Sequence, residues 1–373
     1  MDLRNLPSAS NSELLMDLKY IIKEHALPFL PAKSLFRFLA VCRAWKLHIS
    51  TPSFHHNQSL CCRSISGLFC QTSENAPVFI PINPESCGVP DPSLSFLPER
   101  VVIKASSNGL LCCQGRSGDR YYYLCNPVTK QCKKLPKPTA CHGYDPKLVL
   151  IFEPPLLDFV PEYKLICVFQ STDFGDAIEF EIYTSKNNSW NASGEICFGV
   201  PIFLLGSGVH VNSVVYWPKG FSRILSFDLT KDRSQILKND SEFAECLLGT
   251  FDGRLCKVYI PLPYNKVVVS VLVNIHTNTM PLDDDIGMWE TILDDMWGTR
   301  LVLDPDHTDM PLDQLDDPKL VTVSRDILVF ESENRFYSYD FEHQETKILL
   351  SPPLPAESYY VRWMPYVNSL VSF

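Results

Sequence analysis

Apolar positions in the first sixty residues recur at helical spacing. The capping-box pair Ser10 and Glu13 predicts that a helix begins near residue 11. Pro28 and Pro31 are expected to end this helix, because proline lacks a backbone N–H donor. The apolar positions between these limits share one helical face: Leu14, Leu15, Leu18, Ile21 and Ile22.

A second helical stripe follows, and Thr51-Pro52 is expected to close the helical region. Its apolar members are Leu35, Phe38, Leu39, Cys42 and Trp45. Roughly 45 residues cannot bury so many large apolar side chains by themselves. We therefore expect part of this surface to pack against the rest of the chain, as a helical cap, or against a partner protein.

From about residue 60 the pattern changes to short strands separated by turn residues. A degenerate unit of apolar strand, turn, aromatic-rich strand, polar turn and further strand recurs every ~40 to 50 residues, which suits four-stranded propeller blades. Four units are visible, at 101–136, 163–195, 209–237 and 321–349. Less regular stretches at 60–100 and 245–300 leave room for about six blades.

Repetition of this kind has a physical reason, because one small sheet cannot cover its own apolar face whereas sheets packed around an axis can. Asn108-Gly109, Asn126-Pro127 and Asp252-Gly253 supply turn chemistry between strands. The final run, 359–373, is apolar to its last residue. We expect it to pair into a blade and to help close the ring.

The run from Leu30 to Phe54 resembles the second half of an F-box, whose family pattern reads LP-x-KSL-x-RF-x-x-VC-x-x-W-x-x-x-I-x-x-P-x-F. Thirteen positions match in register: Leu30, Pro31, Lys33, Ser34, Leu35, Arg37, Phe38, Val41, Cys42, Trp45, Ile49, Pro52 and Phe54. In that family three helices bind the adaptor Skp1, which links them to a cullin and a RING protein in an SCF ubiquitin ligase.

By this resemblance, six residues would form or support the Skp1-facing surface: Leu30, Pro31, Leu35, Val41, Cys42 and Trp45. The first half of the pattern departs from the family. Either Ile21-Ile22 align with the family's Ile-Leu and about four residues are inserted, or Pro28 interrupts the last turn of the first helix. Both alternatives affect the geometry of that helix.

The layout also resembles plant F-box proteins with an F-box-associated domain, which is kelch-like. Ser107 to Cys112 match that family's SNGLLC strand, and Cys125-Asn126-Pro127, Thr129 and Leu135-Pro136 match the turn that follows. Cys132 replaces the family's aromatic residue. The resemblance implies an α+β multidomain chain, with a three-helix F-box at 10–58 and an all-β propeller of about six blades at 60–373.

The composition limits the kinds of partner and the cellular location that we expect. A net charge of −10 and dispersed Lys and Arg residues argue against a nucleic-acid partner. No signal peptide is apparent, and no run approaches the ~18 apolar residues that span a membrane, so we expect an intracellular protein of the cytoplasm, the nucleus or both. The 14 cysteines include no C-x-x-C pair and are interpreted as small buried hydrophobic residues.

Catalytic motifs are not evident in the sequence. We interpret Cys141-His142 as a solvated turn rather than a nucleophile pair. The acidic stretch 283–317 is interpreted as an exposed insertion, although recruitment of a basic partner, calcium binding by Asp304, Asp306 and Asp309, or paired glycosidase carboxylates are alternatives. Four aromatic residues belong either to the core or to a recognition face: Trp289, Trp297, Tyr359 and Tyr360.

The favoured hypothesis is a non-catalytic adaptor without cofactor or metal. It would dock Skp1 through the F-box and hold an unidentified target protein through the propeller. One rival is a propeller-fold enzyme with an incidental helical N-terminus, which needs convergent polar or metal-binding side chains in the central channel. Another is a pseudo-receptor that binds targets without engaging Skp1.

Overall fold

The computed structural model describes most of the chain. The described residues are 18, 20–62, 64–72, 75–84, 88–152, 162–220, 223–238, 246–251, 253–260, 266–272, 278–283, 288–292, 297–303, 318–324, 327–332, 335–349 and 361–373. Several predictions of the sequence fall outside these residues. They are the capping box of Ser10 and Glu13, the stripe positions Leu14 and Leu15, Tyr359 and Tyr360, and most of the acidic stretch 283–317.

The N-terminal region is helical, and its first helix is irregular. A π turn, η1 (Ile22–Ala26), leads directly into a 3-10 turn, η2 (Leu27–Phe29). A π turn holds one more residue than an α turn and so absorbs extra chain length within a helix. Pro28 lies in the first turn of η2, where its missing N–H group leaves no hydrogen bond unmade. The sequence left open how the first helix departs from the F-box pattern. In the structure this departure is a π turn followed by a 3-10 turn.

Three α-helices follow: α2 (Ala32–Phe38), α3 (Arg43–Ile49) and α4 (Pro52–Cys61). The expectation that Thr51-Pro52 closes the helical region is wrong, because this pair begins α4. The Thr51 hydroxyl accepts a hydrogen bond from the Phe54 N–H at 3.2 Å and caps the helix. Pro52 occupies the first helical position, which tolerates proline because the N–H there has no partner within the helix.

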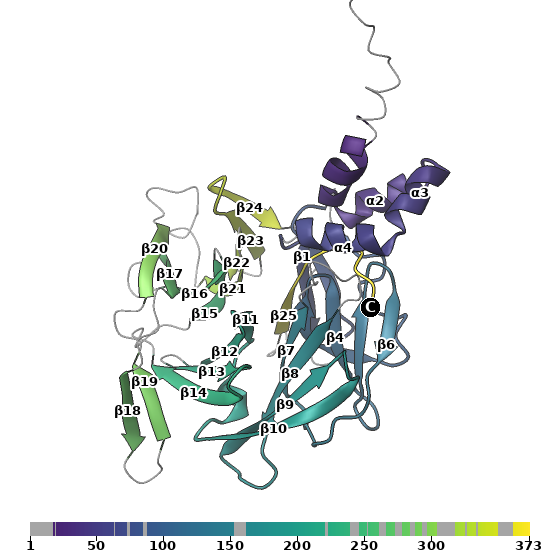
Figure 1. The fold of residues 1–373 in the computed structure, drawn as a ribbon. Coiled ribbons are helices and arrows are strands. Elements are labelled where there is room, and N and C mark those ends of the chain that lie inside the picture. Colours follow the sequence, from purple (N-terminus) through teal and green to yellow (C-terminus); the bar gives the residue numbers. More distant parts are fainter. Residues whose placement is uncertain are drawn as a thin grey trace, which may run out of the picture.

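Within the described residues the strands form six sheets, which are the blades of a propeller (Figure 1). Blade 1 holds β2 (Val78–Pro81), β1 (Gly67–Thr72) and β25 (Val361–Tyr366). Blade 2 holds β3 (Val101–Ser107), β4 (Leu110–Gly115), β5 (Tyr122–Asn126) and β6 (Gln131–Lys134). Blade 3 holds β7 (Lys147–Phe152), β8 (Tyr163–Gln170), β9 (Ala177–Thr184) and β10 (Ser189–Phe198), after which a short 3-10 turn, η3 (Ile202–Leu204), leads to blade 4.

The second half of the ring contains one enlarged blade. Blade 4 holds β11 (Val209–Val211), β12 (Val214–Lys219), β13 (Arg223–Asp228) and β14 (Arg233–Lys238), extended by the hairpin of β18 (Asn278–Asp283) and β19 (Met288–Ile292). Blade 5 holds β15 (Leu247–Phe251), β16 (Arg254–Tyr259), β17 (Val267–Leu272) and β20 (Trp297–Leu303). Blade 6 holds β21 (Lys319–Ser324), β22 (Ile327–Ser332), β23 (Arg335–Asp340) and β24 (Glu345–Leu349).

The six blades close into a ring through strands from opposite parts of the chain. The inner strands β25, β3, β7, β11, β15 and β21 each contact the next one around the axis. In blade 1, β25 pairs antiparallel with β1, from Gly67 opposite Tyr366 to Thr72 opposite Val361. The predictions of about six blades and of a C-terminal run that pairs into a blade are both confirmed.

The inner strands run in one direction, which gives the ring two distinct faces. Arg362 near the start of β25 bonds to Asp145, just before β7, whereas Tyr366 at the end of β25 bonds to Gly109, just after β3. Helix α4 leads into β1 at Gly67, which pairs with Tyr366. The helices therefore lie on the face where the inner strands end, called here the helix face. The opposite face, where the inner strands begin, is called the start face.

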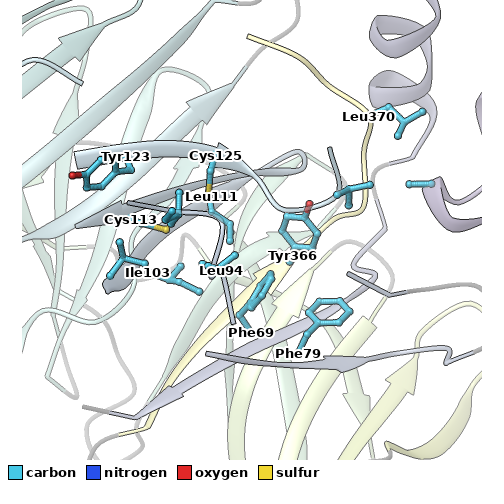
Figure 2. Close-up of a cluster of buried hydrophobic side chains, with 14 of the residues drawn as sticks. Phe69, Phe79, Leu94, Ile103, Leu111, Cys113, Tyr123, Cys125, Tyr366 and Leu370 are labelled. Atoms are coloured by element: carbon cyan, nitrogen blue, oxygen red, sulfur yellow. The ribbon is translucent and has the colours of Figure 1, made fainter. Parts of the chain in front are cut away.

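The largest hydrophobic cluster joins the helices to blades 1 and 2. Leu35 of α2 and Phe54 of α4 are buried in the same cluster as Phe69, Tyr366 and Leu370. Figure 2 shows the ring side of this cluster, with Phe69, Phe79 and Tyr366 grouped beside Leu94 and Leu111. Part of the apolar helical surface is therefore covered by the chain itself.

Candidate protein-docking surfaces

The six residues predicted to face Skp1 divide between the interior and the surface. Leu35 is fully buried beneath the helices, so it supports the surface and cannot itself touch a partner. Three others are half-buried: Leu30, Pro31 and Trp45. Val41 is 61% exposed and Cys42 is also exposed, at the turn between α2 and α3.

Local hydrogen bonding and ring packing fix this turn. The Cys42 Sγ atom caps α3 by accepting a hydrogen bond from the Trp45 N–H at 3.4 Å. The Trp45 ring meets the Phe38 ring edge-on, with centroids 4.9 Å apart. Trp45 and Phe38 both pack against the buried cluster shared with the ring. This arrangement leaves Val41 pointing away from the interior.

Further exposed apolar side chains on the same helices were missed by sequence reasoning. Phe29 is 62% and Leu47 63% exposed, and Phe36 is also exposed. We call Phe29, Phe36, Val41 and Leu47 the outer helical surface. Three residues of the first helix, Leu18, Tyr20 and Ile21, are exposed as well. Several exposed apolar side chains on successive helical elements make this region a candidate binding surface.

The motif matched around residues 107–129 holds the C-terminal tail on the helix face. The Asn126 side-chain amide donates to the Ser369 carbonyl at 3.0 Å and to the Val371 carbonyl at 2.8 Å. The Ser369 hydroxyl donates to the Asn108 carbonyl at 2.8 Å. Both asparagines therefore bind tail residues rather than only forming turns.

Gly109 and Gln58 complete this tail anchor, which we define as Gln58, Asn108, Gly109, Asn126 and Ser369. Gly109 has φ +89°, and a Cβ atom there would collide with the Ser369 side chain. The buried Gln58 of α4 accepts a hydrogen bond from the backbone N–H of Leu370 at 3.0 Å. The anchor thus ties blade 2, the tail and a helix into one unit.

A second polar cluster lies between blades 2 and 3 and corrects the interpretation of Cys141-His142. Cys141 is exposed, but His142 is buried rather than solvated. His142 Nε2 lies 2.6 Å from Glu181 Oε2, and Nδ1 lies 2.9 Å from the Tyr122 hydroxyl and 3.2 Å from Cys167 Sγ.

The protonation states of Cys167 and Glu181 suit a structural role for this cluster, in which it links blades 2 and 3. Burial raises the pKa of the Cys167 thiol well above its ordinary value, so the thiol stays protonated and is a poor nucleophile. Burial alone would raise the pKa of Glu181, but hydrogen bonds from His142 and Thr139 outweigh it and lower the pKa. A charged Glu181 therefore holds the connection between β6 and β7 against β9.

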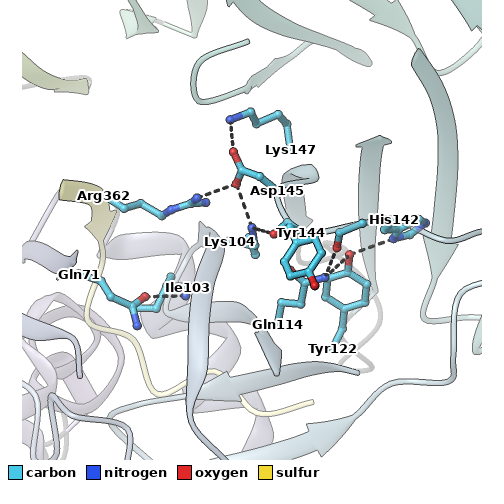
Figure 3. Close-up of polar contacts among 11 residues, drawn as sticks. Gln71, Ile103, Lys104, Gln114, Tyr122, His142, Tyr144, Asp145, Lys147 and Arg362 are labelled. Carbon is cyan, nitrogen blue, oxygen red and sulfur yellow. Dashed lines mark hydrogen bonds and ion pairs between the residues drawn. The ribbon is translucent and has the colours of Figure 1, made fainter. Parts of the chain in front are cut away.

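A charged cluster lies at the axis on the start face, and we call it the axial cluster (Figure 3). Asp145 Oδ1 accepts hydrogen bonds from Lys104 at 3.1 Å and from Arg362 at 2.8 Å, and Oδ2 accepts one from Lys147 at 2.8 Å. The three basic residues come from β3, β25 and β7, the inner strands of three adjacent blades.

The pKa values within the axial cluster reflect its crowding. Burial lowers the pKa of Lys104 to about 8, with a smaller contribution from the charge of Arg362. Burial alone would raise the pKa of Asp145, but Lys147, Lys104 and Arg362 outweigh it and hold that pKa well below its usual range. Asp145 is therefore ionised at any physiological pH.

The described residues show neither a metal-binding cluster nor a membrane-spanning helix. Within the described ranges, no group of three or more His, Cys, Asp or Glu side chains is placed to hold a metal ion. In the part of the chain that the structure describes, no helix is long and apolar enough to cross a membrane. The side chains of Trp289 and Trp297 lie outside the described structure, although their backbones belong to β19 and β20.

Residues 93–373 match the model of the F-box associated beta propeller domain. The chain belongs to this family. The match includes blades 2 to 6, β25 and every ring residue of the tail anchor. It begins after the helices and after β1 and β2, so the F-box assignment of residues 10–58 stays a prediction.

Relatives of this F-box associated propeller protein are F-box proteins of Arabidopsis thaliana. F-box protein At5g49610 is 39% identical over 108 residues, which are 29% of this chain and 30% of that protein. F-box only protein 6 is 25% identical, covering 66% of this chain and 53% of that protein. F-box/kelch-repeat protein At5g43190 is 25% identical, covering 64% and 58%. The chain thus spans between about a third and three fifths of the length of these relatives.

Solved structures are more distant. YCF48 from Cyanidioschyzon merolae aligns over 76% of this chain and 85% of its own, with 9% identity and a TM-score of 0.42. A likeness at this level adds nothing to the blade assignment, which comes from the strand pairing of the protein itself.

Proposed function

We propose that this F-box associated propeller protein is the substrate-recognition subunit of an SCF ubiquitin ligase. The outer helical surface docks a Skp1-like adaptor, which connects the protein to a cullin and a RING protein. The propeller holds a target protein for ubiquitination. The protein makes and breaks no bonds; it raises the concentration of the target near the ubiquitin-charged enzyme.

The observation that carries this proposal is that some apolar side chains of the helices are buried against the ring and others are exposed. Leu35 and Phe54 pack into a core shared with the ring, whereas Phe29, Val41 and Leu47 remain exposed. The chain therefore covers one side of the helices and leaves the other side apolar and open. Val41 and its neighbour Cys42 are also positions that match the F-box pattern. The F-box names of the relatives support the same function.

A propeller enzyme receives no comparable support from the described residues. The cluster of thiol, imidazole and carboxylate around His142 has hydrogen-bond geometry suited to nucleophile activation. However, it is buried between blades 2 and 3, and its thiol keeps its proton. His142 is 7% exposed, and Cys167 and Glu181 are fully buried.

The test is Skp1 binding by a surface variant that leaves the core intact. We expect Leu47→Asp to weaken co-purification with Skp1 at least tenfold, because it places a charge in an apolar interface. Ile348→Asp is a matched control, since Ile348 of β24 is also 63% exposed but lies on the propeller. The control should bind Skp1 like the unchanged chain, and circular dichroism should show both variants folded.

Two outcomes would contradict the proposal in different ways. If Leu47→Asp binds Skp1 as well as Ile348→Asp does, the outer helical surface is not the docking site. If the unchanged chain, although folded, does not bind Skp1 at all, the proposal loses its main support, and the pseudo-receptor and the propeller enzyme remain as interpretations.

A further inference from the structure

We propose that the axial cluster on the start face binds an acidic peptide segment of the target protein. This inference rests on the proposed function, since it names the chemistry of the target that the propeller holds. The segment would bring carboxylate or phosphate groups to Lys147 and Arg362, and an apolar side chain to the neighbouring Tyr144.

The local charge of the axial cluster favours an anionic ligand. Three basic side chains converge on the single carboxylate of Asp145, so positive charge is in excess at the axis. The whole chain, by contrast, carries a net charge of −10. A concentrated patch of opposite sign to the rest of the molecule attracts and orients ligands of complementary charge.

A local irregularity of β3 places Lys104 in the axial cluster. The pairing of β3 with β4 shifts between Ile103 and Ala105, so Lys104 is the extra residue of a β-bulge. A bulge redirects a side chain out of the regular alternation of a strand. Here it directs a buried lysine to Asp145 and to the Tyr144 carbonyl, at 3.1 Å and 3.3 Å. Burying this charge costs free energy. With its side chain 2% exposed, Lys104 positions Asp145 rather than contacting a ligand.

Part of the axial cluster is accessible to a ligand. The side chain of Asp145 is 48% exposed and that of Arg362 is 34% exposed, so a ligand can reach both. Tyr144, the residue before Asp145, is 84% exposed, and the Arg120 guanidinium lies 3.2 Å from the centre of its ring. A cation held over a ring makes a flat, semi-rigid platform for an apolar side chain. The charged and apolar contacts therefore lie side by side.

Several of the other described carboxylates on the start face are engaged or lie on outer loops, and Glu331 of β22 lies opposite Lys319. Asp119 pairs with Lys137, and Glu99 accepts hydrogen bonds from Ser117 and Tyr123. Asp173 and Asp176 lie on the loop between β8 and β9, the middle strands of blade 3. Acidic groups of a bound segment are therefore favoured at the axis and disfavoured at this outer loop.

The start face is also free for a target while the helices hold Skp1. Arg362 and Tyr366 are four residues apart on β25, and they mark the two faces of the ring. A strand rises about 3.3 Å per residue, so the axial cluster and the tail anchor are separated by roughly 13 Å along this strand. A peptide at the axial cluster would therefore approach from the side opposite to α2, α3 and α4.

The experiment uses an array of nine-residue peptides with degenerate flanking positions. The central residue is Glu, Asp or phosphoserine, or else the neutral Gln, Asn or Ser. The full chain is applied in complex with Skp1, and bound protein is measured at low and at physiological salt. We expect at least fivefold more binding to the charged centres, and the preference between carboxylate and phosphate identifies the source of the anion. Binding should fall as salt rises.

The decisive comparison uses a double variant, Lys147→Gln with Arg362→Gln, which leaves the pair of Lys104 and Asp145 in place. We expect it to lose the preference for charged centres. Lys186→Gln is the control, because Lys186 is exposed on the turn between β9 and β10 at the helix face. The control should keep the preference, and all variants should melt at similar temperatures.

The outcomes separate this inference from the proposed function. Equal binding to charged and neutral centres, or an unchanged preference in the double variant, overturns the inference even if Skp1 binds normally. If Skp1 does not bind, the same array on the chain alone still tests the axial cluster. A preference lost in the double variant would then support the acidic-peptide site without the ligase.

Discussion

At the scale of single residues, Gly109 belongs to a motif that can be matched in the sequence, although the sequence predicts only part of its structural role. Gly109 is required for two reasons, its positive φ and the close approach of Ser369. The first reason is visible in the sequence as Asn108-Gly109, a typical turn pair. The second is not, because Ser369 lies 260 residues further along the chain. Only ring closure brings the tail against the turn.

Two glycine variants can separate the cost of the positive φ from the cost of the close approach to Ser369. Gly118 also has positive φ, at +55°, but a Cβ atom there meets nothing within 4 Å. Gly118→Ala should lower the free energy of unfolding by about 1 kcal/mol, the cost of a left-handed alanine. Gly109→Ala should cost a further ~1–3 kcal/mol, because the new methyl group displaces Ser369. The measurement is urea denaturation, and equal midpoints for the two variants would contradict the tail anchor.

At the scale of elements, the repeating strand units were predictable and their irregular neighbours were not. The four units correspond to β3–β6, β8–β10, β11–β14 and β21–β24. Strand β7 was missed because its apolar run stands apart from the rest of its unit. The hairpin of β18 and β19 was missed because its partner is β14, to which β19 pairs in parallel about 50 residues away. Helix α4 was missed because proline both ends and begins helices.

The residues of the candidate sites also differ in whether the sequence predicted them. The F-box resemblance identified Val41 and Cys42, which the structure places on the surface, but it did not separate them from the buried Leu35. The axial cluster left no signal in the sequence. Asp145 and Arg362 are 217 residues apart, and neither belongs to a charged run. Their meeting depends on the order of blades around the axis.

The connection between β6 and β7 leads to a prediction about pH. Because the pKa of Glu181 is lowered in the folded protein, its hydrogen bonds stabilise the fold above the unfolded pKa of about 4.3. This stabilisation is lost as pH falls through the folded pKa. Glu181→Gln should therefore be less stable than the unchanged chain at pH 7, by ~1–3 kcal/mol, and the difference should shrink towards pH 3.

Chemical denaturation of both proteins at several pH values between 3 and 7 measures this difference. Glu179→Gln is a useful comparison, since Glu179 lies on the same strand and bonds to Ser171 rather than to His142. A stability difference for Glu181→Gln that stays constant across this range would show that the carboxylate charge does not hold the connection.

At the scale of the whole molecule, the helices and the ring share one hydrophobic core. Leu35, Ile49 and Phe54 have their buried neighbours in blades 1 and 2 and in the tail, not only in one another. A helical module that folded independently would instead bury its own apolar residues. We infer that the helices and blades 1 and 2 unfold together.

Leu35→Ala tests this coupling. It should lower the free energy of unfolding by ~2–5 kcal/mol, since it leaves a cavity in the shared core. Val41→Ala, at an exposed position of the same region, should change it by less than about 0.5 kcal/mol. Amide hydrogen exchange should show α2 and β3 losing protection to the same extent in Leu35→Ala. Loss of protection confined to the helices would contradict the shared core.

The anchoring of the tail also has a consequence for synthesis of the protein. Gln58 and its partner Leu370 are 312 residues apart. A ribosome adding about 5–20 residues per second needs on the order of 15–60 s to bridge that interval. Throughout it, the helices lack the tail residues that complete the cover of their inner side. A nonsense mutation in blade 6 would remove β25 and the tail. We expect it also to destabilise the helices, because they then never receive Tyr366 and Leu370.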